Sequence, residues 1–297
     1  HLYTKEEFIE SFVKIMCFLS IFAMISGILS IVAPSVLGLF GQYRNSVFDV
    51  YADMFFAFQN TSVIRINSIW GEAGMYAVFL IFALFFETFN CNKEPSFRRI
   101  LILSGALLLT FSTTGLVCYL LYVVALAFNR GRFQGRLLWG MGGIALLALV
   151  LINNVEVIQM QFMTAGSKLS SDDISFIGRF APIIYNIQEG LKNPIFGQGM
   201  TSGKFYVDYS FYQGFLACDT STTTALFKNF GLLLPSITVF LSFRLARNET
   251  QTAMATIVSF VLLLVNVNTQ NLIYDQIYWT ILFVPFMCSA RYMDEIE

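Results

Sequence analysis

The sequence predicts an all-α fold, a polytopic bundle of transmembrane helices that forms one integral membrane domain over residues 1–297. Hydrophobic residues make up 56 % of the chain and charged residues only 12 %, whereas soluble domains carry about 25 % charge. Several apolar runs approach or exceed the ~20 residues that a helix needs to cross the hydrocarbon of a bilayer. No basic block or zinc-ligand spacing suggests nucleic acid as a partner.

The predicted spans follow seven hydrophobic segments, and the third segment decides the topology. The segments are 12–33, 69–89, 100–128, 137–153, 222–243, 253–270 and 275–290. The third contains TFSTTG in its middle, a polar interruption of hydroxyl residues and glycine. One helix through it puts the two most basic short loops on opposite sides of the membrane. Two short helices hinged at Ser112–Gly115 put both loops on the same side.

The charge distribution favours the hinged arrangement. Cytoplasmic loops carry an excess of Lys and Arg, and with the hinge eleven of the eighteen basic residues fall on one side. This predicts eight spans with both ends in the cytoplasm. Two long loops, 34–68 and 154–221, then face outward. The outward basic residues are Arg44, Arg65, Lys168, Arg179, Lys192, Lys204 and Lys228.

Basic residues on the outer side are disfavoured by the same rule, so we expect them to have anionic partners. For any single residue the alternative is an ion pair within the loops. The candidates for such pairs are Asp49, Asp53, Asp172, Asp173 and Glu189.

The termini and the cysteines give little information about function. The five cysteines are scattered and odd in number, which indicates small buried hydrophobes and no disulfide or metal framework. The first apolar run is too long for a cleaved signal peptide. Because the sequence begins with His1 and not with methionine, we expect further residues to precede it.

The segment GRFAPIIYNIQEGLKNPIFGQG, residues 178–199, predicts an amphipathic helix lying on the membrane surface. Pro182 suits the first turn of this helix, and Asn193 before Pro194 suits its end. Arg179, Asn186 and Glu189 are expected on the polar face. The apolar residues recur at helical spacing, at Phe180, Ile183, Ile184, Ile187 and Leu191. A plain surface helix without function is the alternative interpretation.

The first outer loop ends in RINSIWGEAG, where Arg65 and Glu72 are seven residues apart. That spacing is two helical turns, so both lie on one face if the helix begins that early. Glu72 is then an ionisable residue at the membrane interface, which makes it a functional candidate. A structural Arg65–Glu72 pair at the helix end is the alternative.

Together these segments resemble the O-antigen polymerase and ligase superfamily of bacterial envelope enzymes, over about residues 60 to 245. Arg65 with Glu72-Ala73-Gly74 is similar to an arginine, acid and glycine pattern at the outer end of a span. LTFSTTG is similar to a T-x-S-R-G hairpin tip, with Thr113 where arginine is common. NPIFGQG is similar to the N-P-x-x-G-x-G turn of the large outer loop, and Arg179 with Gly190 has the R-x10-G spacing.

CDTSTTTALFKNFGLLLP resembles the segment that re-enters the membrane, which in the ligases carries a histidine. Counting back from Gly231 puts Asp219 at that histidine, and the one histidine of the chain is His1. The resemblance therefore favours a polymerase over a ligase. It implies a GT-C-like, multi-pass protein of the bacterial cytoplasmic membrane.

The implied reaction joins oligosaccharide repeat units carried on polyprenyl diphosphate into surface polysaccharide, on the outer face of the membrane. No cofactor and no metal are implied. The implied partners are the lipid-linked oligosaccharide, the bilayer, and the chain-length regulator and flippase of the same pathway. O-antigen, capsule and exopolysaccharide all stay open as products.

The resemblance and the chemistry together give the candidate site. Guanidinium and ammonium groups hold a leaving diphosphate, and tyrosine rings stack on sugars or anchor at the interface. The predicted roles are diphosphate binding by Arg65, Arg179, Lys192 and Lys204; catalytic base, Asp219 or Glu72; and substrate contact by Tyr185, Asn186 and Tyr206.

Three other functions stay open. A ligase-like transferase uses the same donor. A transporter of a lipid-linked or anionic substrate uses the same outward cations, and it is expected to carry charges near the membrane midplane. The spans here contain almost no charge, with Lys228 and Asp275 near span ends. A scaffold subunit of an envelope complex is the third.

Overall fold

The computed structural model describes residues 4–33, 35, 42–44, 49–51, 58–60, 64–90, 94–129, 174–199, 204–209, 212–218 and 220–287. The chain divides into two compact units. Unit 1 is His1–Gly166 with Glu249–Ser259 and Met287–Glu297, and unit 2 is Ser167–Asn248 with Phe260–Phe286.

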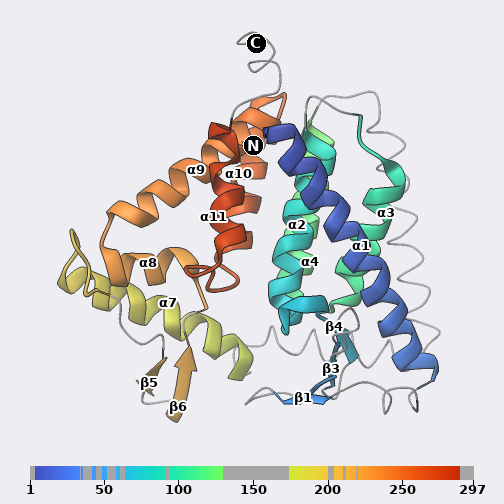
Figure 1. The fold of residues 1–297 in the computed structure, drawn as a ribbon. Coiled ribbons are helices and arrows are strands. Elements are labelled where there is room, and N and C mark those ends of the chain that lie inside the picture. Colours follow the sequence, from blue (N-terminus) through green and yellow to red (C-terminus); the bar gives the residue numbers. More distant parts are fainter. Residues whose placement is uncertain are drawn as a thin grey trace. The chain divides into compact units, whose positions relative to one another are not determined.

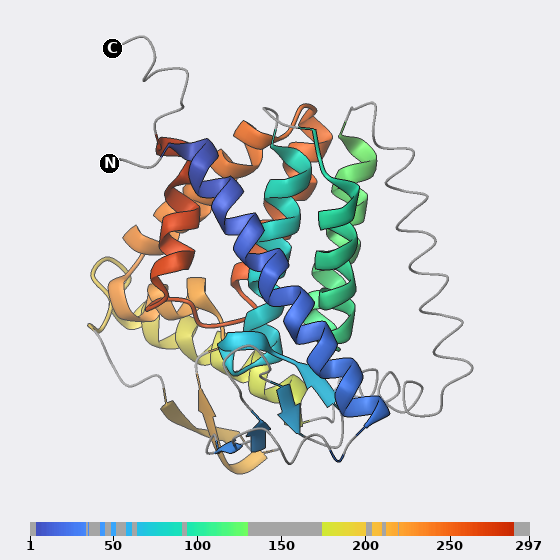
Figure 2. The same ribbon diagram turned by 45° about the vertical axis from the view of Figure 1, so that its right-hand side comes forward.

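The described part of unit 1 contains the helices α1 to α4, and α2 contacts each of the other three (Figures 1 and 2). The helices are α1 (Lys5–Val32), α2 (Ala73–Phe89), α3 (Phe97–Leu109) and α4 (Thr113–Phe128). Helix α1 begins at a capping box: Thr4 Oγ1 accepts from the Glu7 amide, and the Glu7 carboxylate accepts from the Thr4 amide. Nearly every side chain of α2 is buried, so this helix forms the core of the unit.

The predicted hinge in 100–128 is confirmed as a turn between α3 and α4. Thr110 Oγ1 donates to the Leu107 carbonyl at 2.7 Å and accepts from the Ser112 amide at 3.2 Å. Ser112 then caps α4, because its Oγ accepts from the Gly115 amide at 3.2 Å. Polar side chains therefore satisfy the backbone groups that end one helix and begin the next.

Charged side chains join other parts of unit 1. Arg99 of α3 donates to Glu10 of α1 at 2.8 Å and to Glu87 of α2 at 3.3 Å. Lys5 pairs with the buried carboxylate of Glu249. These contacts connect helices that are far apart in sequence, so they fix how those helices pack.

The first outer loop contains short antiparallel strands that the sequence analysis did not predict. Strands β1 to β4 pair in chain order, and the short helix η2 (Ser68–Trp70) follows them. The strands are Gln42–Arg44, Asp49–Tyr51, Phe58–Asn60 and Ile64–Ile66. Arg65 therefore lies in a strand, and α2 begins only at Ala73. The condition for Arg65 and Glu72 to share a helix face is not met.

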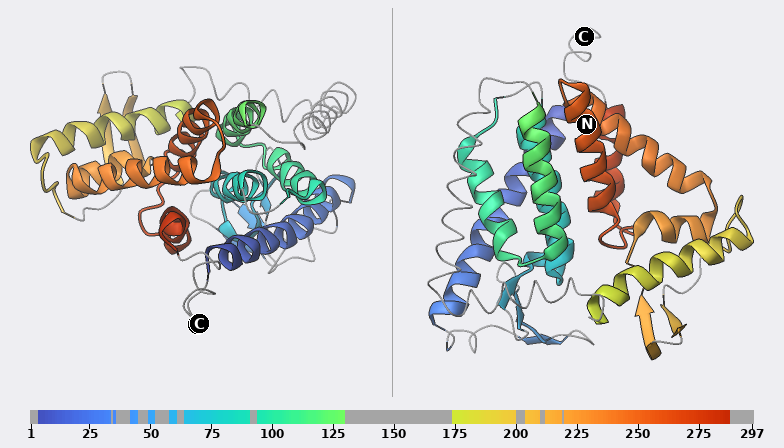
Figure 3. Two further views of the ribbon diagram at one scale, coloured as in Figure 1. Left: turned by 90° about the horizontal axis from the view of Figure 1, so that it is seen from above. Right: turned by 180° about the vertical axis from the view of Figure 1, so that it is seen from behind.

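The rest of the described chain is again mainly helical. Its elements are α7 (Ile174–Lys192), β5 (Lys204–Tyr209), β6 (Tyr212–Cys218), α8 (Thr222–Phe230), α9 (Leu233–Glu249), α10 (Ala253–Val267), α11 (Gln276–Phe283) and η3 (Val284–Phe286). Strands β5 and β6 form an antiparallel hairpin. Helices α7 and α8 lie side by side (Figure 3).

Two boundaries in this part differ from the prediction. Helix α7 ends at Lys192 as expected, but it begins at Ile174, so Pro182 lies inside the helix and not in its first turn. The predicted span 222–243 is two helices, because Gly231 adopts a φ of +68° and ends α8. A left-handed residue cannot continue a right-handed helix, and the chain changes direction there (Figure 1).

The predicted fold class, an α-helical bundle, is confirmed, because the described residues are mainly helical. Among the described residues one helix, Lys5–Leu29, is long and apolar enough to cross a membrane. Four shorter apolar helices are Ala73–Phe89, Thr113–Phe128, Ala253–Val267 and Gln276–Phe286. The predicted span 137–153 lies outside the described residues, and the eight-span topology stays a prediction.

Candidate functional site

In unit 2 the turn Asn193–Gly199 crosses the carboxyl end of α8 and is bound to it through backbone atoms. The amides of Gln198 and Gly199 donate to the carbonyls of Lys228 and Asn229, each at 2.9 Å. The Leu232 amide donates to the Pro194 carbonyl, also at 2.9 Å. We call this contact the backbone crossing. It fixes the N-P-x-x-G-x-G sequence on the last turn of α8.

Glycine is required on both sides of the backbone crossing. Gly197 has a φ of +69°, and a Cβ there would lie 2.4 Å from the carbonyl carbon of Asn229. Gly231 has a φ of +68°, and its Cβ would lie 2.2 Å from the carbonyl oxygen of Ile195. Each glycine thus adopts a left-handed backbone conformation and leaves room for the opposing segment of the same chain.

Gly190 allows α7 to pack closely against α8 at Phe227, one helical turn before Gly231. A Cβ at Gly190 would lie 2.5 Å from a ring carbon of Phe227. The contacts between the two segments follow each other in the same order along the chain: Asn186 meets Thr224, Gly190 meets Phe227, and Gln198 meets Lys228. The R-x10-G glycine therefore has a packing role at this interface.

The two helices enclose a polar cluster made of Tyr185, Asn186, Glu189, Gln198 and Lys228. Lys228 is only 2 % exposed, and its ammonium lies 5.7 Å from the centre of the Tyr185 ring, within the range of a cation–π contact. Asn186 is fully buried, and its Nδ2 donates to Thr224 Oγ1 at 3.4 Å. Its Oδ1 has no hydrogen-bond partner within the described part of the chain.

Glu189 connects this cluster to the surface. Its carboxylate accepts from Gln198 Nε2 at 2.7 Å and from Lys192 Nζ at 2.5 Å. The hydrogen bond from Gln198 lowers the pKa of Glu189 most, and the Lys192 ammonium lowers it further. Glu189 is therefore ionised at neutral pH, and it pairs with Lys192 in this structure.

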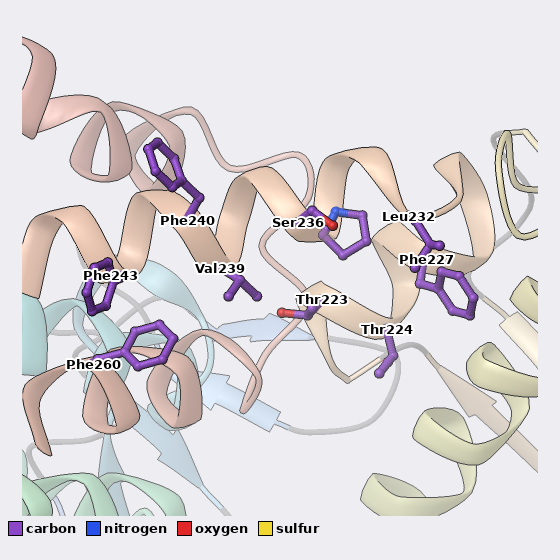
Figure 4. Close-up of a pocket in the computed structure, with 10 residues that line it drawn as sticks. Thr223, Thr224, Phe227, Leu232, Ser236, Val239, Phe240, Phe243 and Phe260 are labelled. Atoms are coloured by element: carbon purple, nitrogen blue, oxygen red, sulfur yellow. The ribbon is translucent and has the colours of Figure 1, made fainter. Parts of the chain in front are cut away.

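An apolar groove of about 570 Å³ lies beside the polar cluster, between α8, α9 and Phe260 of α10 (Figure 4). Its remaining lining residues are Thr223, Thr224, Phe227, Leu232, Pro235, Ser236, Val239, Phe240 and Phe243. The rings of Phe243 and Phe260 meet edge to face at 5.5 Å. Thr224 belongs to both features, because it lines the groove and accepts the hydrogen bond from Asn186.

In unit 1 the structure describes Arg65 and Glu72. Arg65 is half-buried, and its Nε donates to the Thr110 carbonyl in the α3–α4 turn at 3.0 Å. Ser68 and Phe111, close to these two partners in sequence, have φ values of +48° and +46°. Such strain in residues other than glycine is typical of functional sites. Glu72 is exposed and directly precedes α2.

No protein-family model, no curated protein and no solved structure matches this chain.

The predicted site residues are thus distributed as follows. Tyr185 and Asn186 lie in the polar cluster, and Lys192 borders it. The backbone of Arg179 belongs to α7, and the backbones of Lys204 and Tyr206 belong to β5. The side chains of those three residues, and the whole of Asp219, lie outside the described residues.

Lys228 and Gln198 lie in the polar cluster and were not among the residues predicted for the site. Lys228 carried a usable signal, since an ionisable side chain within an apolar segment is a functional candidate. Gln198 carried none, because only the backbone crossing brings it to Glu189. Within the described residues no group of three His, Cys, Asp or Glu side chains could hold a metal ion. The arrangement in unit 2 combines a buried ammonium, Lys228, with an apolar groove that shares Thr224 with the polar cluster.

Proposed function

We propose that this protein is a membrane glycosyltransferase that polymerises polyprenyl-diphosphate-linked oligosaccharide repeat units on the outer face of the bacterial cytoplasmic membrane. The observation that carries the proposal is the backbone crossing. It holds a buried ammonium, a buried amide and a carboxylate next to an apolar groove. A diphosphate on a hydrocarbon chain needs this combination of a cationic and an apolar surface.

The membrane location is supported by large apolar side chains that face outward. Their spacing of three or four residues places them along one face of each helix. A soluble protein rarely exposes such continuous apolar surface, whereas lipid requires it. The exposed residues are Ile15, Phe18, Ile21, Ile25 and Ile28 of α1, and Val117, Leu120, Val124 and Phe128 of α4.

Helix α7 fits the same environment as an interfacial helix. Ile184, Ile187 and Leu191 of its apolar stripe are exposed. Asn186 and Gly190, on another face, pack against α8. An apolar face directed away from the protein is what a helix at the headgroup boundary buries in lipid.

In the proposed reaction a hydroxyl of the acceptor oligosaccharide attacks the anomeric carbon of the donor. The bond from that carbon to the diphosphate oxygen breaks, and the diphosphate leaves with the electron pair. The hydroxyl proton passes to a base, Asp219 or Glu72, within hydrogen-bond reach. Cations already in position stabilise the charge that develops on the leaving group. Lys228 joins Arg179, Lys192 and Lys204 of unit 2 in this role, and Arg65 stays a separate prediction in unit 1.

The sugar contacts follow from the same cluster. Tyr185 offers a ring face, and Asn186 offers a carbonyl oxygen without a partner in the described structure. Tyr206 keeps its predicted role as a sugar contact. A transporter of a lipid-linked anion is the second candidate, because a buried ammonium beside an apolar groove also suits binding without chemistry.

Purified protein in detergent tests the proposal directly. Supplied with polyprenyl-diphosphate-linked repeat units, it should produce a ladder of longer oligosaccharides and release polyprenyl diphosphate. Lys228→Met should slow the reaction by about 10²-fold or more, as the loss of one charge-stabilising group does in other enzymes. Lys14→Met, an exposed ammonium in unit 1, is the control. A protein that moves labelled lipid across vesicles and makes no polymer is a transporter.

A further inference from the structure

We propose that Asn268, in the loop between α10 and α11, is a positioning residue for the polar cluster. It caps the amino end of α8 from outside that helix, and the capped turn carries the hydroxyl that orients Asn186. The inference rests on the proposed function only for the reaction in which its effect is measured. It adds a second attachment of α8, at the end opposite the backbone crossing.

Helix α8 takes its amino-terminal cap from another part of the chain. Ser221 occupies the capping position, but in the described structure its hydroxyl accepts no amide of the helix. The first amides of a helix have no partner within it, and a capping oxygen normally accepts from the second or third of them. Thr223 is the second residue of α8, and its amide donates to Asn268 Oδ1 at 3.0 Å. The cap is therefore supplied by a residue 45 positions later.

The loop that carries Asn268 is bound to the same end of α8 by further hydrogen bonds (Figure 1). The Ser221 hydroxyl donates to Asn268 Oδ1 at 2.8 Å. Thr222 is fully buried, and its Oγ1 donates to the Gln270 carbonyl at 2.6 Å and accepts from the Leu272 amide at 2.9 Å. Side-chain and backbone groups of the loop thus hold the first turn of α8 together.

The Asn268 amide has one orientation in which both of its ends are satisfied. Its Nδ2 donates to the Leu264 carbonyl in α10 at 2.8 Å, so its oxygen faces α8. A flipped amide would direct its NH₂ group at the Thr223 amide and its oxygen at the Leu264 carbonyl, and neither pair can form a hydrogen bond. The acceptor that caps α8 is therefore fixed by α10.

The capped turn of α8 reaches the polar cluster through Thr224. Its Oγ1 accepts from Asn186 Nδ2 at 3.4 Å. Asn186 is fully buried, and its Oδ1, without a partner in the described part of the chain, is left to accept from a substrate hydroxyl. Because short helices are unstable alone, the first turn of α8 depends on its cap. Loss of the Asn268 oxygen should therefore displace Thr224 and release the Asn186 amide.

Lys228 lies at the other end of α8 and should respond less. Its carbonyl accepts from the Gln198 amide, so the backbone crossing holds it without help from Asn268. In the proposed reaction Asn186 contacts the sugar, whereas Lys228 stabilises the charge that develops on the leaving group. A contact that is equal in the ground state and the transition state changes KM and not kcat. Loss of the Asn268 cap should therefore raise KM and leave kcat nearly unchanged.

Two substitutions of Asn268 separate the cap from general stability. Asn268→Leu and Asn268→Asp both lose the hydrogen bond to the Leu264 carbonyl, so both should unfold at lower temperature than wild type. Only Asn268→Leu loses the capping oxygen, because aspartate keeps it and adds a charge that suits a helix amino terminus. In Asn268→Leu the KM should rise roughly fivefold, the effect of one hydrogen bond, with kcat within about twofold. In Asn268→Asp the KM should stay near that of wild type.

Asn271 provides a matched control in the same loop. Its Oδ1 accepts from the Ile273 amide at 3.3 Å, a contact within the loop. Asn271→Leu therefore removes an asparagine of the loop and leaves the cap of α8 in place. Its KM should equal that of wild type.

Hydrogen exchange of the purified full chain in detergent, measured by mass spectrometry, detects the positioning without any reaction. Peptides from residues 221–226 should exchange about fivefold faster in Asn268→Leu than in wild type. Peptides from residues 183–190 of α7 should also exchange faster, and the backbone around Lys228 should not. Asn268→Asp and Asn271→Leu should keep the wild-type pattern over 221–226.

Unchanged exchange over residues 221–226 in Asn268→Leu would overturn the inference. So would a KM that rises equally in Asn268→Leu and Asn268→Asp, because it would then follow stability and not the cap. The polymerisation assay separates the two proposals. If the exchange pattern is as expected and wild type makes no polymer, the positioning by Asn268 stands and the proposed function fails. If polymer forms and the exchange over 221–226 is unchanged in Asn268→Leu, this inference alone fails.

Discussion

Replacing Gly197 by alanine should break the backbone crossing. Its φ of +69° is a left-handed conformation, which costs an L residue about 1–2 kcal/mol. The added Cβ would also lie 2.4 Å from Asn229 backbone atoms, and such overpacking costs roughly 1–3 kcal/mol. The two adjacent hydrogen bonds, from the Gln198 and Gly199 amides, contribute about 1 kcal/mol each. Together the loss is about 4–7 kcal/mol.

Gly199 provides a matched control two residues away. Its φ is +79°, and none of the described residues lies within 4 Å of a Cβ built on it. Gly199→Ala therefore carries only the conformational cost of about 1–2 kcal/mol. The difference between the two variants isolates the close approach of the two segments and its hydrogen bonds, at about 3–5 kcal/mol.

Thermal unfolding of the two purified variants in the same detergent measures this difference. At ~2–4 °C per kcal/mol, Gly197→Ala should unfold roughly 6–20 °C below Gly199→Ala. It should also lose most polymerisation, because the backbone crossing fixes Lys228 and Gln198. Equal unfolding temperatures would show that the turn Asn193–Gly199 and the end of α8 do not meet at Gly197. The backbone crossing described above would then be wrong.

Four further predictions follow from the same structure. Arg65→Ala should reduce polymer formation and destabilise the protein by about 1–2 kcal/mol, since Arg65 also binds the α3–α4 turn. Arg65→Lys should restore only part of the polymer formation and of the stability, as measured by gel and by thermal unfolding. Asp219→Asn should stop polymer formation if Asp219 is the base, and a near wild-type ladder would assign that role to Glu72 or to no protein group. The pKa of Glu189 is lowered on folding, so its contribution to stability is present at neutral pH and is lost as the pH falls below ~4.3; unfolding temperatures of wild type and Glu189→Gln should converge there. Glu72→Cys should react with an impermeant thiol reagent from outside, and Arg98→Cys should react only after permeabilisation. The reverse labelling pattern would show that the predicted orientation in the membrane is wrong.

Local polar signals predicted the parts of the fold that depend on them. The α3–α4 turn follows from TFSTTG, because hydroxyl side chains within an apolar run supply caps at that point. The end of α7 follows from Asn193 before Pro194, which blocks helix continuation. Both features are properties of a few adjacent residues, and sequence alone contains them.

Tertiary contact determined the parts that sequence did not predict. The prediction continued the span 222–243 through Gly231, whereas α8 ends there and Ile195, a residue distant in sequence, occupies the space that a side chain would need. Pro182 was expected at a helix start, yet the helix continues through it from Ile174. The contact between Lys228 and the Tyr185 ring arises from the packing of α7 on α8.

Disruption of the gene, followed by gel analysis of surface polysaccharide, tests polymerisation most directly. The ladder of chain lengths should disappear in the disrupted strain while a single repeat unit is still attached. Expression of wild-type protein should restore the ladder, and expression of Lys228→Met at the same level should not. An unchanged ladder in the disrupted strain, or the loss of the single repeat as well, would contradict the assignment of this protein as the polymerase.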